Sequence, residues 1–431
     1  MDVATDQPAH GTVAGPTPGK AAPRDHSSRN TAVLVGFTAI TNLADGVTKV
    51  VLPLMATALT DSPAQVAGVG LTLTLPWLLV ALHVGVLVDR FDRRLLLWLA
   101  DGARLLVVGA LLLLALSDNV TVPALYAGGL ALGVAEVVAL TSAATLVPSA
   151  VAPAGQERAN AWVAGAETAC NEFCGPFVGG LLVAAGASVA LGWTAVGYLI
   201  GTLILILLVG RFKPQSDDMR PAGSVNQRIT EGLRFLWQQR LLRLMALALT
   251  VLSACWGAWL ALMPLLATTL MHLDAREYGI LLSALGAGGL VGALTVTSVN
   301  RLLGRRWAMF ADLLGTAAMV ATPVITTNLW VVAGGAFLGG MGGILWTVNA
   351  RTIGQRLVPD AMFGRYNAAA RLFSWGAMPL GAGLVGVLAE WFGMRTAFAV
   401  FAVATVLTIV PFLRTVTPAA LAEADAVPAH D

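Results

Sequence analysis

Long apolar runs, separated by short polar turns, fill the chain from about residue 32 to about residue 413. A helix needs about 20 residues to cross the roughly 30 Å hydrocarbon core of a bilayer, and each run is close to that length. The pattern therefore predicts an all-α membrane protein with twelve transmembrane helices. The expected spans lie at about 32–58, 64–88, 95–116, 122–147, 160–185, 189–210, 244–270, 275–299, 306–324, 329–350, 363–389 and 395–413.

Three polar segments lie outside these spans. Residues 1–30 are rich in Pro, Gly and Ala and contain no apolar run, so we expect a disordered cytoplasmic tail and no cleavable signal peptide there. Residues 211–243 form the longest internal polar stretch, a cytoplasmic linker in which Asn226–Arg240 has the pattern of an amphipathic surface helix. Residues 414–431 are expected to form a second cytoplasmic tail.

The two parts of the chain on either side of the linker repeat each other. Pro53–Leu59 matches Pro264–Leu270 at an offset of 264 − 53 = 211. The same offset links Arg90 with Arg301, Arg94 with Arg305, and Asp101 with Asp312. We therefore expect two pseudo-symmetric six-helix bundles, residues 31–210 and 244–413. Parallel repeats of this kind hold a substrate near the membrane midplane, at the interface between the repeats.

Composition and charge placement support the membrane assignment. Hydrophobic residues make up 57% of the chain and charged residues 12%, whereas a soluble domain has about 25% charged residues. Most of the 26 Lys and Arg residues fall on one side of the twelve-span arrangement, and only Arg276 and Arg395 fall in loops on the other side. By the positive-inside rule, both termini lie in the cytoplasm and the chain crosses the inner (plasma) membrane many times.

A basic loop connects the second and third spans. Gly85–Arg94 reads G-x-L-x-D-R-x-x-R-R, and it resembles the loop between helices 2 and 3 of the major facilitator superfamily. Other segments are similar to the exporter branch related to the enterobactin and macrolide efflux proteins. These segments are Asn42–Gly46, Leu59–Ser62, Leu99–Arg104, Arg158–Ala161 and Glu231–Leu236.

This resemblance implies a secondary transporter that works by alternating access. In the fifth span, Gly175-Pro176-x-x-Gly179-Gly180 resembles the motif of the family's antiporters, in which Gly and Pro allow close packing and a bend. The residues expected to control the conformational change are Gly85, Asp89, Arg90, Arg94, Asp101, Arg104, Glu172, Gly175, Pro176, Gly179 and Gly180. The alternative is that the basic loop only sets topology and that Asp101 and Arg104, at i, i+3 spacing, only tie helix ends together.

Three carboxylates inside predicted spans are candidates for proton coupling: Asp45, Glu136 and Glu167. An ionised side chain at mid-bilayer costs about 2.5–3.5 kcal/mol on insertion scales, so each needs a reason to be there. Asp45 lies one turn from Lys49, and the two are expected to pair on one helix face. Glu136 has no charged residue within a turn. The alternative for each carboxylate is a neutralised or hydrogen-bonded group that only fixes helix packing.

Polar and aromatic side chains inside the spans are candidates for substrate contact. Lipid-facing Trp normally lies at the headgroup level, whereas several Trp residues here fall within spans. The expected substrate-binding residues are Asn42, Lys49, Asn171, Trp256, Trp259, Trp346, Asn349, Phe373 and Trp375. Together they suit a cavity for a bulky amphipathic molecule, although helix packing explains each aromatic residue equally well. The fourth span lacks the Arg that many proton antiporters carry there.

Other classes of function are disfavoured. The Gly-rich run Gly334–Gly343 has neither a Lys-Ser/Thr end nor a preceding strand, so it favours helix packing over nucleotide binding. The three Cys residues lie inside spans without metal-ligand spacing, and no span carries a Ser/His or Cys/His set.

We therefore expect a monomeric transporter, not an enzyme, that exports an amphipathic organic compound such as a drug, an antibiotic or a siderophore-like metabolite in exchange for protons. It would use no cofactor or metal, and it would bind lipid but no nucleic acid. The alternatives are a lipid or lysolipid flippase of the same fold and, in another class, a membrane-embedded receptor or enzyme.

Overall fold

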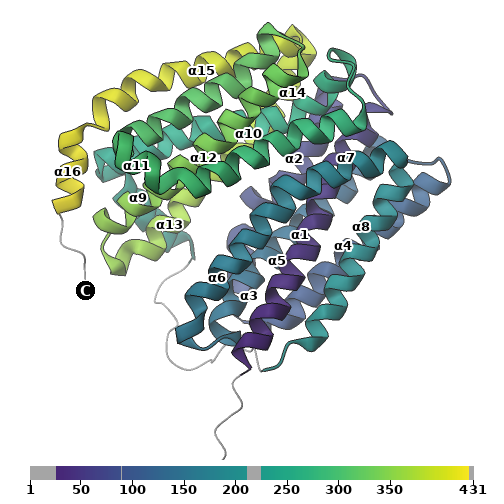
Figure 1. The fold of residues 1–431 in the computed structure, drawn as a ribbon, viewed down its shortest axis with the longest axis horizontal. Helices are drawn as coiled ribbons and strands as arrows, with labels where there is room; N and C mark the ends of the chain where they lie inside the picture. Colours follow the sequence, from purple (N-terminus) through teal and green to yellow (C-terminus); the bar gives the residue numbers. More distant parts are fainter. Residues whose placement is uncertain (1–25, 89, 211–224, 427–431) are drawn as a thin grey trace, which may run out of the picture.

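The computed structural model describes residues 26–88, 90–210 and 225–426. Two helical bundles stand side by side, one from each half of the sequence (Figure 1). The first bundle contains α1 (Ser27–Thr57), α2 (Pro63–Leu79), α3 (Ala81–Val88), α4 (Arg93–Leu116), α5 (Val122–Ala150), α6 (Pro153–Glu167), the π-helical η1 (Thr168–Cys174), α7 (Gly175–Ala185), α8 (Ala187–Ile204) and η2 (Leu205–Leu207). The second contains α10 (Arg240–Thr269), α11 (Ala275–Ile325), α12 (Leu329–Leu357), α13 (Asp360–Ser374), α14 (Ala377–Phe392) and α15 (Met394–Thr415).

Twelve crossings follow from these elements, as the apolar pattern predicts. In the described ranges, nine helices are long and apolar enough to cross a membrane. One of them, α11, holds two spans that reverse at Gly304, whose φ of +80° is a conformation that favours glycine. The second span is broken into α2 and α3, and the fifth is assembled from α6, η1 and α7.

Polar residues in the turns start many of these helices. Asp92 accepts hydrogen bonds from the backbone N–H groups of Arg94 and Leu95 at the start of α4. Asp274 and Glu277 form a reciprocal capping box at the start of α11. Such caps satisfy backbone donors that the first helical turn leaves free, so short polar turns between apolar runs fix where each span begins.

Two short helices lie outside the bundles. α9 (Val225–Gln238) falls within the predicted linker and packs on α13, where Glu231 and Arg365 form an ion pair of 2.8 Å. α16 (Pro418–Ala426) falls within the segment expected to be a tail, and it packs on α12. The linker helix α9 is attached to the second bundle through its contact with α13.

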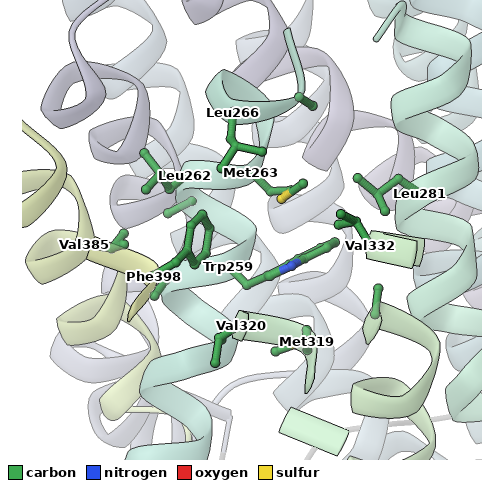
Figure 2. Close-up of a cluster of buried hydrophobic side chains, with 14 of the residues drawn as sticks. Trp259, Leu262, Met263, Leu266, Leu281, Met319, Val320, Val332, Val385 and Phe398 are labelled. Carbon is green, nitrogen blue, oxygen red and sulfur yellow. The ribbon is translucent and has the colours of Figure 1, made fainter. Parts of the chain in front are cut away.

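Each bundle has its own apolar core. In the second bundle, the fully buried indole of Trp259 lies at the centre of a cluster with Leu281, Met319 and Val332, while Phe398 packs nearby (Figure 2). A separate cluster, which includes Val47 and Val51, fills the first bundle. Each core lies mostly within one bundle, and the buried side chains of the first bundle that reach into the second core, Val50, Leu54 and Ala67, are few.

The bundles meet at the end of the molecule opposite the start of α1. There α2 packs on α10 and α14, and α7 packs on α11 (Figure 1). A Cβ atom on Gly180 would lie 2.5 Å from the carbonyl oxygen of Ala275 and 2.8 Å from Cα of Gly279. At the same end, Glu390 of α14 accepts hydrogen bonds from the Ser62 hydroxyl at 2.8 Å and from the Ala64 N–H at 3.2 Å. The bundles therefore close on each other backbone to backbone.

We predict that Gly180→Leu prevents this closure, because its side chain has no space between α7 and α11. Transport should fall several-fold, and a cysteine placed at Ser62 should react faster with a membrane-impermeant maleimide. Gly334→Leu is the matched control, since a Cβ atom on Gly334 meets no heavy atom within 4 Å. Equal labelling rates in both variants would show that the close approach at Gly180 does not govern closure.

Candidate functional site

A buried ion cluster lies inside the first bundle. The Arg104 guanidinium on α4 lies 3.2 Å from the Asp45 carboxylate on α1 and 3.1 Å from the Asp101 carboxylate on its own helix. The Tyr198 hydroxyl on α8 donates a 2.7 Å hydrogen bond to the second oxygen of Asp45. All four side chains are buried, at exposed fractions of 7% or less. The predicted i, i+3 pair of Asp101 and Arg104 is thus present, as part of a larger cluster.

The charges in this cluster do not balance. Two carboxylates share one guanidinium, and Oδ2 of Asp101 is buried without a hydrogen-bond partner in the described part of the chain. Uncompensated charge away from water is costly, so a cluster with an extra carboxylate favours taking up one positive charge. A proton is the smallest species that can supply it.

A second polar network starts one helical turn further along α1. The Lys49 ammonium donates a 2.7 Å hydrogen bond to the Asn171 amide oxygen, and the Asn171 amide donates to Asn42 at 2.9 Å. Lys49 also forms an ion pair of 3.7 Å with Glu136 of α5. The network thus joins α1, α5 and η1. Asn171 lies in the π-helical segment, a geometry that occurs frequently at functional sites.

Two expectations about charge pairing are therefore wrong. Asp45 does not pair with Lys49, because Asp45 points between α4 and α8 toward Arg104 and Tyr198. Glu136 is not an isolated carboxylate, because Lys49 reaches it from α1. Spacing along one helix cannot show a partner that a neighbouring helix supplies.

A cavity of about 390 Å³ adjoins the ion cluster and the Asn42 end of the second network. Its walls come from α1, α4, α5 and α6 of the first bundle and from Arg351 of α12 in the second. Asp45, Arg104 and Glu167 line it together with the apolar side chains of Leu140 and Val147. Its volume lies in the range of pockets that enclose drug-sized molecules, and the mixture of apolar walls with a few charges is typical of them.

Comparisons with known proteins agree with this geometry. The family model described as transmembrane secretion effector matches residues 28–430. The chain belongs to this family of the major facilitator superfamily. The transporter is 31% identical to the multidrug efflux pump Tap of Mycobacterium tuberculosis, over 94% of its own length and 97% of Tap. It is 28% identical to the enterobactin exporter EntS of Citrobacter koseri, over 85% and 86% of the two chains.

A solved structure shows the same fold. A bacterial homologue of the iron transporter ferroportin, crystallised in an inward-facing state, superposes with a TM-score of 0.70 over 90% of the transporter and 98% of that chain, at 18% identity. The predicted superfamily, the efflux branch and the twelve-helix fold are thereby confirmed. The chain is a multi-pass membrane transporter and not an enzyme.

The predicted aromatic residues of the transporter do not form one wall. Trp259 and Trp346 are fully buried in the second bundle, where Trp346 packs against Phe412, so neither lines the cavity. Phe373 stacks on Trp237 of α9 at 6.5 Å between ring centroids. The half-buried Trp256 lies beside Gly343 of α12. Helix packing accounts for these contacts.

Two other predicted substrate residues have partners of their own. Trp375, between α13 and α14, stacks across the bundles on Trp77 of α2 at 4.8 Å between ring centroids. Asn349 is buried, and its amide donates a hydrogen bond to the Asn300 side chain at 3.0 Å. Trp77 and Trp375 lie where α2 and α13 end, so the stack marks the point at which both spans are broken.

The predicted gating residues lie at helix ends and close crossings. Arg94 donates hydrogen bonds to the backbone carbonyls of Ile206 and Leu208, which are the free acceptors at the end of the sixth span. The Arg90 side chain is exposed, a Cβ atom on Gly85 would meet nothing within 4 Å, and Asp89 lies outside the described residues.

The glycine motif of the fifth span lies between the bundles. Gly175 and Gly179 pack on α1, against Gly46 and Val47 respectively. On the other side, Gly180 and the Pro176 carbonyl face Gly279 of α11, and the Glu172 backbone faces Gly286. The motif therefore connects α1, which carries Asp45, to α11 of the second bundle.

Sequence reasoning missed two residues of the site. Tyr198 carries a sequence signal, because a tyrosine in the middle of an apolar span needs a partner for its hydroxyl group. For Arg351, the repeat offset gives Leu140 as the equivalent position (351 − 211 = 140), and only the structure shows that both residues line the cavity.

We predict that Arg104→Gln destabilises the transporter strongly, because it leaves two buried carboxylates without a cation. Removing one partner of a buried ion pair costs about 3–5 kcal/mol. Tyr198→Phe should cost less, about 1.5–3 kcal/mol for one hydrogen bond to a charged group. Thermal unfolding in detergent measures both, with the exposed Arg276→Gln as the control. An unfolding temperature unchanged by Arg104→Gln would contradict the ion cluster.

Proposed function

We propose that the transporter uses the proton gradient to export amphipathic organic compounds across the plasma membrane. The observation that carries the proposal is the buried cluster in which Asp45 and Asp101 share Arg104. Such a cluster can bind one proton, and a carboxylate couples transport to protons when its environment differs between the two conformations of the cycle.

Asp45 is well placed for such a change of environment. It lies on α1, which packs on η1 and α7 on one side and contacts α10 of the second bundle. Arg104 and Tyr198 hold its two oxygens from α4 and α8. A shift of α1 relative to α4 and α8 lengthens these contacts, and a proton then replaces the guanidinium as the partner of the Asp45 carboxylate.

Glu136 and Glu167 complete the proposed coupling set. Glu136 shares Lys49 with Asn171, and Glu167 lies on the cavity wall within electrostatic range of the same ammonium. Protonation of Glu136 frees Lys49 to bind other acceptors, including a substrate oxygen. The polar chain of Lys49, Asn171 and Asn42 is the proposed link between the proton sites and the substrate cavity.

The substrate class rests on the relatives and on the cavity. Two proteins of similar sequence are a multidrug efflux pump and an enterobactin exporter. A cavity of about 390 Å³ with apolar and charged walls suits drugs, antibiotics and siderophore-like metabolites. Among the predicted aromatic residues, Trp259 and Trp346 are enclosed and Trp256 packs on α12, so only the exposed Trp375, which lies outside the cavity lining, stays a candidate for substrate contact.

The proposed conformation is open to the cytoplasm. The positive-inside pattern predicts that both termini lie in the cytoplasm, and the bundles are closed at the opposite end, around Gly180 and Glu390. Arg94 and the fifth-span motif, from Glu172 to Gly180, are proposed to control the exchange between this conformation and the outward-open one.

Proton coupling is tested by flux into and out of proteoliposomes. We expect Asp45→Asn or Glu136→Gln to abolish export driven by a pH gradient, whereas substrate counterflow without a gradient survives at least in part. The reason is that counterflow needs alternating access but no proton exchange. Asp312→Asn is the matched control, because Asp312 is a buried carboxylate of the second bundle whose one hydrogen-bond partner among the described residues is the Thr316 hydroxyl.

Full gradient-driven flux in both neutral variants would contradict the assignment of the coupling site to Asp45 and Glu136. Equal loss of gradient-driven flux and of counterflow would show instead that these residues are needed for alternating access itself.

A further inference from the structure

One wall of the cavity comes from the other bundle. Arg351 of α12 reaches a space whose other lining residues belong to the first bundle. Its side chain is exposed, and it forms no hydrogen bond or ion pair within the described ranges. The repeat pairs Arg351 with Leu140 of α5, at 351 − 140 = 211, and both residues line the same cavity. Of the two pseudo-symmetric positions, therefore, only the one in the second bundle carries a charge.

A second uncommitted charge lies in the same cavity. Arg104 also lines it, but Asp45 and Asp101 occupy that guanidinium. Glu167, the last residue of α6, forms no hydrogen bond or ion pair with another described residue. The cavity thus presents one available carboxylate from the first bundle and one available guanidinium from the second.

We propose that Glu167 and Arg351 form a two-point site for compounds that carry both a cationic group and a carboxylate. This inference rests on the proposed export function and adds the substrate class to it. A planar guanidinium binds a carboxylate through two parallel hydrogen bonds, and Glu167 attracts the cationic group. Leu140 and Val147 supply apolar surface between them.

The site also links binding to the conformational change. Glu167 and Arg351 lie on different bundles, so a ligand that holds both charges bridges the bundles. When the cavity closes and excludes water, the attraction between each of these side chains and the opposite charge of the ligand becomes stronger, because electrostatic interactions strengthen as the local dielectric constant falls. A ligand with only one charge leaves the other group unpaired and is bound less tightly.

The test compares two dyes that differ in one group. Rhodamine B carries a free carboxylate and a cationic ring system, and its ethyl ester keeps the cation but lacks the carboxylate. Binding to the purified full-length transporter in lipid nanodiscs is followed by fluorescence. We expect the wild type to bind rhodamine B about tenfold more tightly than the ester, which corresponds to about 1.4 kcal/mol.

Substitutions at Arg351 and Glu167 separate the two contacts. Arg351→Gln should weaken the binding of rhodamine B to the level of the ester and leave ester binding unchanged, which also shows that the variant is folded. Arg351→Lys, which keeps the charge without the planar fork, should restore part of the preference. Glu167→Gln should weaken both dyes by the same factor. Arg301→Gln, at an exposed position of α11 outside the cavity, should change neither.

Equal wild-type binding of the two dyes would overturn the proposal, and so would an Arg351→Gln variant that weakens both dyes equally or neither. Export of the ester driven by a pH gradient is measured in parallel. If that export persists while the preference for rhodamine B is absent, the two-point site fails and the proposed function stands. Loss of all gradient-driven export in the wild type would instead overturn the proposed function.

Discussion

The guanidinium of Arg104, held between two buried carboxylates, is the interaction on which the first bundle depends. It joins α1 to α4, and Tyr198 extends the contact to α8. In a lipid environment an unpaired charge is expensive, so these three helices cannot separate freely unless the charge in the cluster changes. Because two carboxylates share one cation, the uptake of one proton is a natural way to change the net charge of the cluster. Stability and the proposed coupling to protons thus come from the same four side chains.

The rest of the architecture allows this local event to move whole bundles. Separate apolar cores keep each bundle rigid, while glycines let α7 approach both α1 and α11 at backbone distance. Gly175 lies against Gly46, one residue from Asp45, and Gly180 lies against Gly279. The fifth span is therefore a direct mechanical connection between the ion cluster and the contact surface of the bundles. The second bundle has Asp312 and, at the position equivalent to Arg104, Gly315 (104 + 211 = 315), so this charge arrangement belongs to the first bundle.

Sequence alone predicted the features that the bilayer imposes and missed those that depend on neighbouring helices. The twelve spans and the internal repeat are visible because lipid demands long apolar runs and the repeat conserves the positions of Pro, Arg and Asp. The partner of Asp45 was predicted wrongly, since the nearest cation along α1 is Lys49, whereas the cation it contacts comes from α4. Trp259 reads like any intramembrane tryptophan, and only the packing of α10 against α11, α14 and α15 shows that it is enclosed.

Proton release on ligand binding is the measurement that tests proton coupling at the first bundle most directly. The purified transporter, in weakly buffered detergent solution with a pH indicator, is mixed with a saturating amount of the rhodamine B ethyl ester. We expect the wild type to release protons on binding the dye, and the Asp45→Asn/Glu136→Gln double variant to bind the dye with clearly smaller proton release, because Glu167 is then the one member of the proposed coupling set that remains. If the double variant releases as many protons as the wild type, the coupling site does not lie at these two carboxylates.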